Sequence, residues 1–184
     1  MRRFLACALL ASLSVGLHAT VILPIEFREL VTIAPVIVHG RVVDVRTEWV
    51  DGRRAIETFV TVQADEYLKG NLGETLTVRV PGGQMGRYRT VFVGAPEFRD
   101  GDEVVLFLKL AGPSYPYIIG LSQGAFRVVP DARTGRRMVT TPIVMGTGGD
   151  ERERIVRGDV TRRPLAIEAF RDAVRQVMGK GAGR

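Results

Sequence analysis

The segment Gly120-Leu121-Ser122-Gln123-Gly124 matches the G-x-S-x-G pattern of a nucleophile elbow, in which a serine attacks an acyl carbon. An elbow needs a strand before the serine, a helix after it and a histidine later in the chain. No histidine follows Ser122, and the apolar pattern after Gly124 is typical of another strand. We therefore predict a tight turn whose glycines allow unusual backbone angles. A hydrolase that uses Ser122 is kept as an alternative.

Residue types that bind metals are few and scattered. His39 lies in a valine-rich segment and has no cysteines or clustered carboxylates near it in sequence to complete a zinc site. Asp100, Asp102 and Glu103 lack the spacing of the twelve-residue calcium loop. Cys7 is the only cysteine, and it lies in the N-terminal apolar segment. We predict no catalytic residue, no metal and no cofactor.

A glycine-rich segment at residues 82–86 lacks the Gly-Lys-Ser/Thr of a phosphate loop, and no helix pattern follows it. The arginines and the tyrosine beside it suit the binding of an anionic or sugar-like ligand. Trp49 precedes the Asp51-Gly52 turn signal, where an exposed tryptophan suits a contact surface. The predicted binding surface consists of Trp49, Gln84, Arg87, Tyr88 and Arg89.

The N-terminus has the order of an export signal. Two arginines are followed by an uncharged, mostly apolar run at residues 4–17 and by small residues that end at Ala19. We predict that residues 1–19 are a signal peptide and that the mature chain begins at Thr20. Because the apolar run is short for a bilayer, we expect no transmembrane segment in the mature chain. A membrane-anchoring or buried helix is the alternative.

Composition indicates a globular protein with a basic excess. Hydrophobic residues make up 46% and charged residues 25% of the chain, and the formal net charge is +6. This charge favours anionic surfaces, although a solvated basic surface without a partner explains it better, because the excess is small and arginine-rich segments lie in predicted loops. Export and the 7% aromatic content argue against nucleic acid as a partner.

Short strand patterns separated by turn signals fill the middle of the chain. Residues 56–64 alternate between apolar and polar side chains, which predicts a half-buried strand. Residues 103–110 form a nearly continuous apolar run, which predicts a strand buried on both faces. Further strands are predicted at residues 36–47, with a bulge at Gly40, and at 75–80, 117–119, 125–129 and 138–140.

Helix patterns flank these strands. Residues 25–33 predict a short helix, and residues 165–178 an amphipathic one that begins after Pro164 and is capped by Gly179. The predicted fold is mainly β, a five-stranded OB-like barrel or a sandwich, with a short N-terminal helix and a C-terminal amphipathic helix. After the signal peptide we predict an N-terminal segment at 20–35, a β domain at 36–140, a polar linker at 141–163, and a helix with its tail at 164–184.

Several segments together resemble a family of exported bacterial proteins to which no activity is assigned. These segments are VIVHGRV at 36–42, EYLKG at 66–70, VPGG at 80–83, GDEVVLFL at 101–108 and GLSQG at 120–124. More remotely, the order of a valine-rich strand, a Lys-Gly turn and a "glycine, acid, apolar" strand is similar to netrin-like domains. Those domains include the tissue inhibitors of metalloproteinases, and the resemblance implies an OB-type barrel.

The same resemblance implies a site at the mature N-terminus. In those inhibitors the terminal amine and carbonyl chelate the zinc of the protease, and the next side chain enters its specificity pocket. Thr20 and Val21 take these positions here, with Thr20 in place of the inhibitors' cysteine. We expect an exported, non-catalytic binding module whose partner is an exported protein or an envelope polyanion. A metalloproteinase inhibitor that acts through Thr20 is the alternative.

Overall fold

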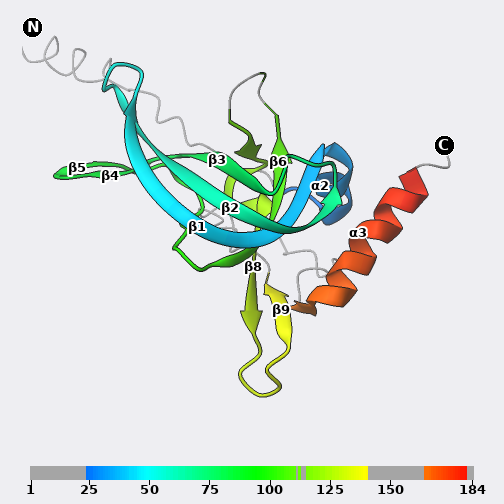
Figure 1. The fold of residues 1–184 in the computed structure, drawn as a ribbon. Coiled ribbons are helices and arrows are strands. Elements are labelled where there is room, and N and C mark those ends of the chain that lie inside the picture. The colour runs from blue at the N-terminus through cyan, green and yellow to red at the C-terminus, as the bar shows by residue number, and fades with distance from the viewer. Residues whose placement is uncertain (1–23, 111, 113–114, 141–163, 182–184) are drawn as a thin grey trace, which may run out of the picture.

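The computed structural model describes residues 24–110, 112, 115–140 and 164–181. The chain is mainly β, with one large sheet and two helices, α2 (Phe27–Ile33) and α3 (Ile167–Gly181) (Figure 1). Among the described residues, no helix is both long enough and apolar enough to cross a membrane. The predicted signal peptide, the polar linker, Thr20 and Val21 lie outside the described residues.

Two long antiparallel strands, β1 (Val36–Val50) and β2 (Ala55–Lys69), form the largest hairpin of the sheet. The predicted bulge at Gly40 is confirmed, because the pairing register shifts between His39 and Gly40. A side chain at Gly40 would place its Cβ 2.3 Å from the carbonyl oxygen of Gln63. Only glycine therefore lets β2 approach β1 this closely.

The sheet continues through strands that pair across long sequence separations. Its order is β1-β2-β3-β7-β6-β8-β9-β10, and β1 also pairs with β6. The bounds of the other strands are β3 Thr75–Pro81, β6 Glu103–Lys109, β7 Tyr117–Ile118, β8 Ala125–Pro130, β9 Arg137–Thr140 and β10 Leu165–Ala166. A separate two-stranded ladder joins β4 (Gly83–Met85) to β5 (Tyr88–Thr90).

Strand β6 separates two apolar clusters, as the prediction of a strand buried on both faces requires. Val105 and Phe107 belong to the cluster that also contains residues of α2 and α3. Val104, Leu106 and Leu108 belong to the other cluster, together with the inward-facing valines of β1, β2 and β3. Burial of each such side chain stabilises the fold by roughly 1.5–3 kcal/mol.

Four phenylalanine rings form the centre of the helix-covered cluster. Phe27 of α2 and Phe170 of α3 lie with Phe107 and Phe126, and the ring centroids are between 5.3 and 6.4 Å apart. Most of these pairs meet edge to face, the arrangement that aromatic quadrupoles favour. The predicted amphipathic character of the C-terminal helix is thus confirmed, since Ile167, Phe170 and Val174 are all buried on one apolar stripe of α3.

The predicted bounds of the C-terminal helix are wrong at both ends. Leu165 and Ala166 pair with Val139 and Met138 as strand β10, so Pro164 precedes a strand and the helix begins at Ile167. The free edge of β9 takes this pairing because it supplies partners for otherwise open backbone groups. The helix also runs through Gly179 to Gly181, where the sequence predicts a cap at Gly179.

Candidate functional site

Two hairpins meet at the end of the molecule opposite α3 (Figure 1). One is the turn between β1 and β2, and the other is the β4–β5 ladder, in which Gln84 pairs with Arg89 and Met85 with Tyr88. The Trp49 ring meets the Tyr88 ring edge to face, with centroids 5.5 Å apart. The structure therefore brings Trp49 into contact with a predicted residue that lies 39 positions away in sequence.

Two glycines hold the second hairpin against the first. A Cβ at Gly83 would come 2.6 Å from Thr47 Cγ2 and 2.8 Å from Thr58 Oγ1, so only glycine fits between these strands. The backbone N–H of Gly82 donates to the carbonyl of Ile56 at 3.2 Å, and Thr58 Oγ1 donates to the carbonyl of Gly82 at 2.8 Å. The glycine-rich segment is thus a packing element between two hairpins.

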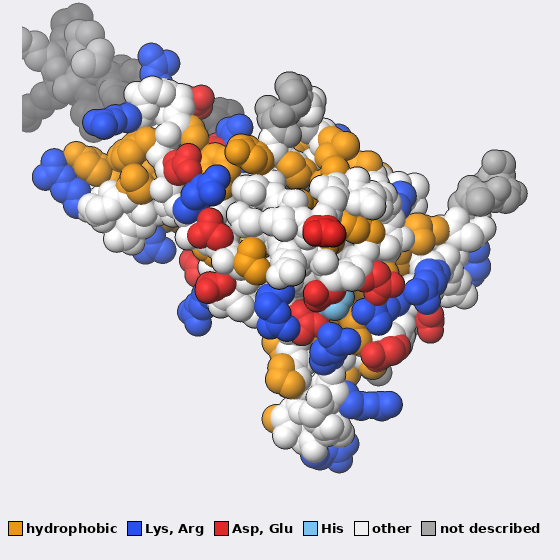
Figure 2. Space-filling model, in the orientation of Figure 1, with side chains coloured by type: hydrophobic (Ala, Val, Ile, Leu, Met, Phe, Trp, Pro, Cys, Tyr) orange, Lys and Arg blue, Asp and Glu red, His pale blue; other side chains and the backbone are white. Residues whose placement is uncertain are grey.

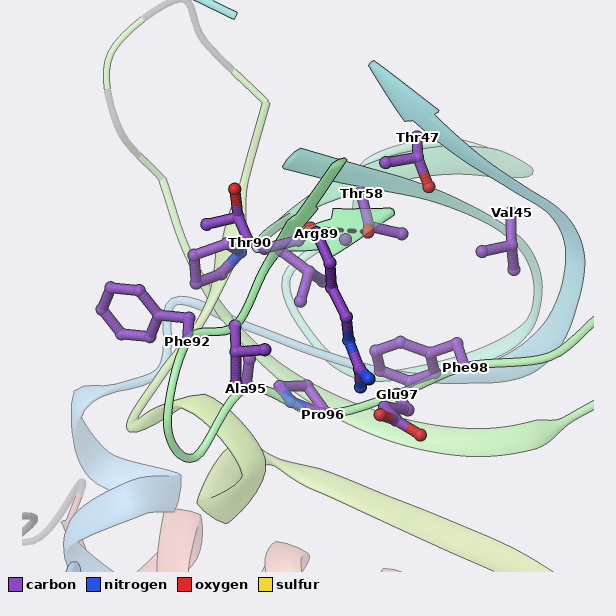
Figure 3. A pocket seen from close by; sticks show the side chains of 15 residues that line it. Val45, Thr47, Thr58, Arg89, Thr90, Phe92, Ala95, Pro96, Glu97 and Phe98 are labelled. Carbon is purple, nitrogen blue, oxygen red and sulfur yellow. Dashed lines mark hydrogen bonds between the residues drawn. The ribbon is translucent and has the colours of Figure 1, made fainter. Parts of the chain in front are cut away.

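A pocket of about 270 Å³ lies between these hairpins and the segment that follows β5 (Figure 3). Its volume is slightly below that of small-molecule sites, which are roughly 300–1,000 Å³. The Arg89 side chain extends across it toward Glu97 and Phe98, whereas the Phe92 ring turns away from it. The lining residues are Val45, Thr47, Thr58, Val80, Pro81, Gly82, Gly83, Arg89, Thr90, Val91, Phe92, Ala95, Pro96, Glu97 and Phe98.

Arginines surround this end of the molecule without acidic partners. Arg53, Arg54, Arg87 and Arg89 are exposed, and none forms an ion pair within the part of the chain that the structure describes. The Arg87 guanidinium lies over the Tyr88 ring, 5.1 Å from its centroid, and its Nη2 donates to the Tyr88 hydroxyl at 2.9 Å. Four cationic groups here are therefore free to pair with an anion from outside the chain.

Exposed apolar side chains lie in the same region, and the sequence analysis missed them. Val91, Phe92 and Val93 are 69%, 52% and 60% exposed, and Tyr88 is 50% exposed. The sequence offered a signal, because three consecutive apolar residues before Gly94 do not alternate with polar ones as in a half-buried strand. We use the term hairpin surface for Trp49, Arg53, Arg54, Arg87, Tyr88, Arg89, Val91, Phe92 and Val93.

Gln84 of the predicted binding surface plays a local role. Its side chain is exposed, and its Nε2 donates to the carbonyl of Gly86 at 3.2 Å, within the β4–β5 turn. Of the other four predicted residues, Trp49 and Arg87 both contact Tyr88, and Arg89 lines the pocket beside them.

A second hollow of about 690 Å³ lies over the outer face of β2 and β3. Phe59 and Tyr115 form its aromatic wall, with ring centroids 5.3 Å apart. Its cation, Arg79, is already held by the buried Glu57 carboxylate, which accepts from Arg79 Nη2 at 2.6 Å. That hydrogen bond is the main reason why the pKa of Arg79 is raised. Because Arg79 is paired, this hollow offers less to an anion than the hairpin surface does.

Ser122 lies in a four-residue 3-10 helix, η1 (Leu121–Gly124), between β7 and β8. A strand follows it, where a nucleophile elbow needs a helix. The N–H of Ser122 donates to the carbonyl of Gly94 at 2.9 Å, and a Cβ at Gly124 would come 2.4 Å from the Ile119 carbonyl oxygen. Gly124 therefore allows a close approach of the backbone in this turn, and the Ser122 N–H ties the turn to Gly94, the residue after the 91–93 run.

The histidine and the acidic residues at the start of β6 are held by hydrogen bonds and ion pairs within the protein. His39, 1% exposed, is the only histidine among the described residues, and its Nε2 lies 2.8 Å from Glu103 Oε1. Glu103 also accepts from Arg137 at 3.0 Å, and Asp102 from Arg127 at 2.6 Å. In the described ranges, no group of three or more His, Cys, Asp or Glu side chains is arranged to hold a metal ion. Comparisons with protein families, with curated proteins and with solved structures give no match to this chain.

Proposed function

We propose that the chain is an exported, non-catalytic module that binds an anionic partner outside the cytoplasm through the hairpin surface. One observation carries this proposal: four unpaired arginines lie beside exposed aromatic and aliphatic side chains. A solvated surface would not expose Val91, Phe92 and Val93 in one run, because exposed apolar patches mark contact sites. Export is supported by the basic, apolar and small-residue order of the N-terminus.

The fold that we propose for this module is a small OB-like barrel, as in netrin-like domains. The support is the order of strand pairing, which runs from β1 through β2, β3, β7 and β6 and returns to β1. The β3–β7 pairing is parallel, at Arg79 and Tyr117, and the other pairings in this ring are antiparallel. Such a frame would hold the two hairpins rigidly at one end, where they form a preorganised contact surface.

Each part of the hairpin surface contributes a different contact to binding. The guanidinium groups of Arg87 and Arg89 offer paired N–H donors, which fit phosphate, sulfate or carboxylate oxygens. Trp49 and Tyr88 offer ring faces for apolar parts of the partner. The pocket beside Arg89 has room for one small group, so it can fix the partner's position.

The test is affinity capture with matched arginine variants. The full chain would be processed by its exporting host, immobilised, and incubated with the exported and envelope fractions. We expect R87Q/R89Q to retain the bound species at least about tenfold less than the unchanged protein, because two charged donors are lost. R133Q/R136Q removes two exposed arginines from the β8–β9 loop and should retain that species fully.

Equal retention by the unchanged protein and R87Q/R89Q would contradict the proposal. So would an equal loss in R133Q/R136Q, because only net charge would then matter. Raising the salt to about 0.5 M should release a partner held mainly by exposed charges.

A further inference from the structure

We infer that the hairpin surface docks the protein onto an anionic lipid membrane, with residues 91–93 among the acyl chains and the arginines on the headgroups. This inference rests on the proposed function and names the partner's chemistry, which is a phospholipid surface rich in phosphate anions. It is carried by the shape, the exposure and the charge of the hairpin surface.

The inserted part is a short apolar loop with free side chains. Val91, Phe92 and Val93 are consecutive, and each is more than half exposed. Figure 3 shows the Phe92 ring directed away from the pocket and from the other lining side chains. Because they point outward, these side chains can enter an apolar phase without any rearrangement of the core.

The backbone of the apolar loop lies close to the hairpin that carries Trp49. Gly82 lies between them, since its N–H bonds to the carbonyl of Ile56, the residue paired with Trp49. On the other side of Gly82, a Cβ would come 3.4 Å from the backbone nitrogen of Phe92. Trp49 in turn contacts Tyr88. The buried backbone of Gly82 therefore lies between the hairpin that carries Trp49 and the loop that carries Phe92.

Trp49 and Tyr88 have the character of side chains at a membrane boundary. Each combines an apolar ring with a polar N–H or O–H group, and such rings collect at the level of the headgroups. The Arg87 guanidinium is fixed over the Tyr88 ring and faces outward with it. Amphipathic rings, cations and a short apolar loop are three kinds of side chain that bind a bilayer surface.

The charges at this end complement anionic lipid. Figure 2 shows Lys and Arg side chains around hydrophobic ones at the end of the molecule where the two hairpins lie. Acidic side chains lie at this end too: Glu48 accepts from Arg46, Asp51 is exposed in the β1–β2 turn, and Glu97 lines the pocket that Arg89 crosses. Each arginine near an anionic membrane strengthens attachment by about fivefold.

A lipid surface fits these features better than a protein partner does. A stable protein interface buries about 800 Å² on each side and needs a complementary apolar centre. Here the apolar part is one exposed run of three residues, and the exposed Arg87 and Arg89 precede it in the chain. Insertion into lipid needs only a few apolar side chains when basic residues accompany them.

The protein carries its own probe for the experiment, because Trp49 is its only tryptophan. The full chain, processed by its exporting host, would be mixed with vesicles of phosphatidylcholine alone or with about one third phosphatidylglycerol. We expect sedimentation with the anionic vesicles only. The Trp49 emission should shift to shorter wavelength and be quenched by lipids brominated near the headgroup.

Matched variants separate insertion from charge. F92S/V93S should weaken vesicle binding at least about tenfold, because two apolar side chains no longer enter the lipid. V129S, which changes an exposed valine of β8, should bind as the unchanged protein does. R87Q/R89Q should weaken binding by about 30-fold and R133Q/R136Q should not. Thermal unfolding of each variant shows that the fold is retained.

Four outcomes would overturn the inference. Sedimentation without a Trp49 shift or quenching would mean charge attraction with no insertion. Unchanged binding of F92S/V93S, with its fold intact, would remove the apolar loop from the contact. Binding to dextran sulfate or to an exported protein but not to vesicles would refute membrane docking and leave the proposed function standing. Binding to none of these would refute both.

Discussion

Phenylalanines with valines around them occur at both ends of this molecule, with opposite consequences. At the helix-covered end, Phe170 is 1% exposed and lies among Phe27, Phe107 and Phe126. At the hairpin end, Phe92 is 52% exposed and no described element covers it. The residue types are alike, so burial is decided by position: Phe170 lies between α3 and the sheet, whereas Phe92 lies in a loop outside the sheet. Helices α2 and α3 cover the sheet at one end only (Figure 1).

The largest expected effect tests this difference directly. Phe170→Ala should lower the free energy of unfolding by about 3–5 kcal/mol, because it opens a cavity where four rings meet. Phe92→Ala should change it by no more than about 0.5 kcal/mol, as for an exposed position. Urea unfolding followed by circular dichroism measures both values.

A similar loss in the two variants would break the comparison. It would mean that the Phe92 ring is packed in solution, and the hairpin surface would then have no free apolar loop.

The next prediction compares the loss of stability when one glycine in each region is replaced. Gly40→Ala should cost about 2 kcal/mol, since its Cβ meets the Gln63 carbonyl oxygen and the strands must separate. Gly86 lies in the β4–β5 turn with φ +59° and open space around it, and asparagine tolerates that backbone conformation. Gly86→Asn should therefore cost less than about 1 kcal/mol. Urea midpoints measure the difference, and equal costs would show that the bulge relaxes freely.

Much of the helix-covered end is predictable from sequence, because its signals are local and periodic. The continuous apolar run of β6, the glycine bulge of β1 and the stripe that includes Phe170 each follow from side-chain spacing within one element. Burial on both faces of β6 was predictable for the same reason. The pattern itself says that no face of that strand meets water.

The hairpin end was predictable only as a set of candidate residues. Trp49 and Tyr88 are good contact residues by type, but their meeting depends on a β4–β5 ladder held by Gly82 and Gly83. The exposure of Phe92 depends on the absence of a covering layer among the described elements, which no local pattern encodes. Strand β10 was missed for a related reason, since it forms only because β9 offers a free edge.

The smallest expected effect concerns the other protruding hairpin, whose loop is held by a charge. Asp131 Oδ1 accepts from the Thr134 hydroxyl at 2.8 Å, from the Thr134 N–H at 2.7 Å and from the Arg133 N–H at 3.1 Å. The two bonds from Thr134 are the main reason why the pKa of Asp131 lies below its ordinary value of 3.8. In the β4–β5 turn the Gln84 side chain donates to a neutral acceptor, the carbonyl of Gly86, so the two loops should differ in their response to acid.

The sign of this response follows from the lowered pKa. A carboxyl group whose pKa is lower in the folded than in the unfolded protein stabilises the fold fully when the pH lies above its unfolded-state pKa. That stability is lost as the pH falls through the folded-state pKa. The amide proton of Thr134 should therefore lose protection from solvent exchange as the pH falls below about 4, whereas Asp131→Asn should show no such step. Hydrogen exchange followed by NMR measures the protection of the Thr134 amide at each pH. The amide of Tyr88 in the β4–β5 ladder serves as an internal reference. A parallel loss at Tyr88 would mean that acid loosens the whole fold and that the two hairpins do not differ in this way.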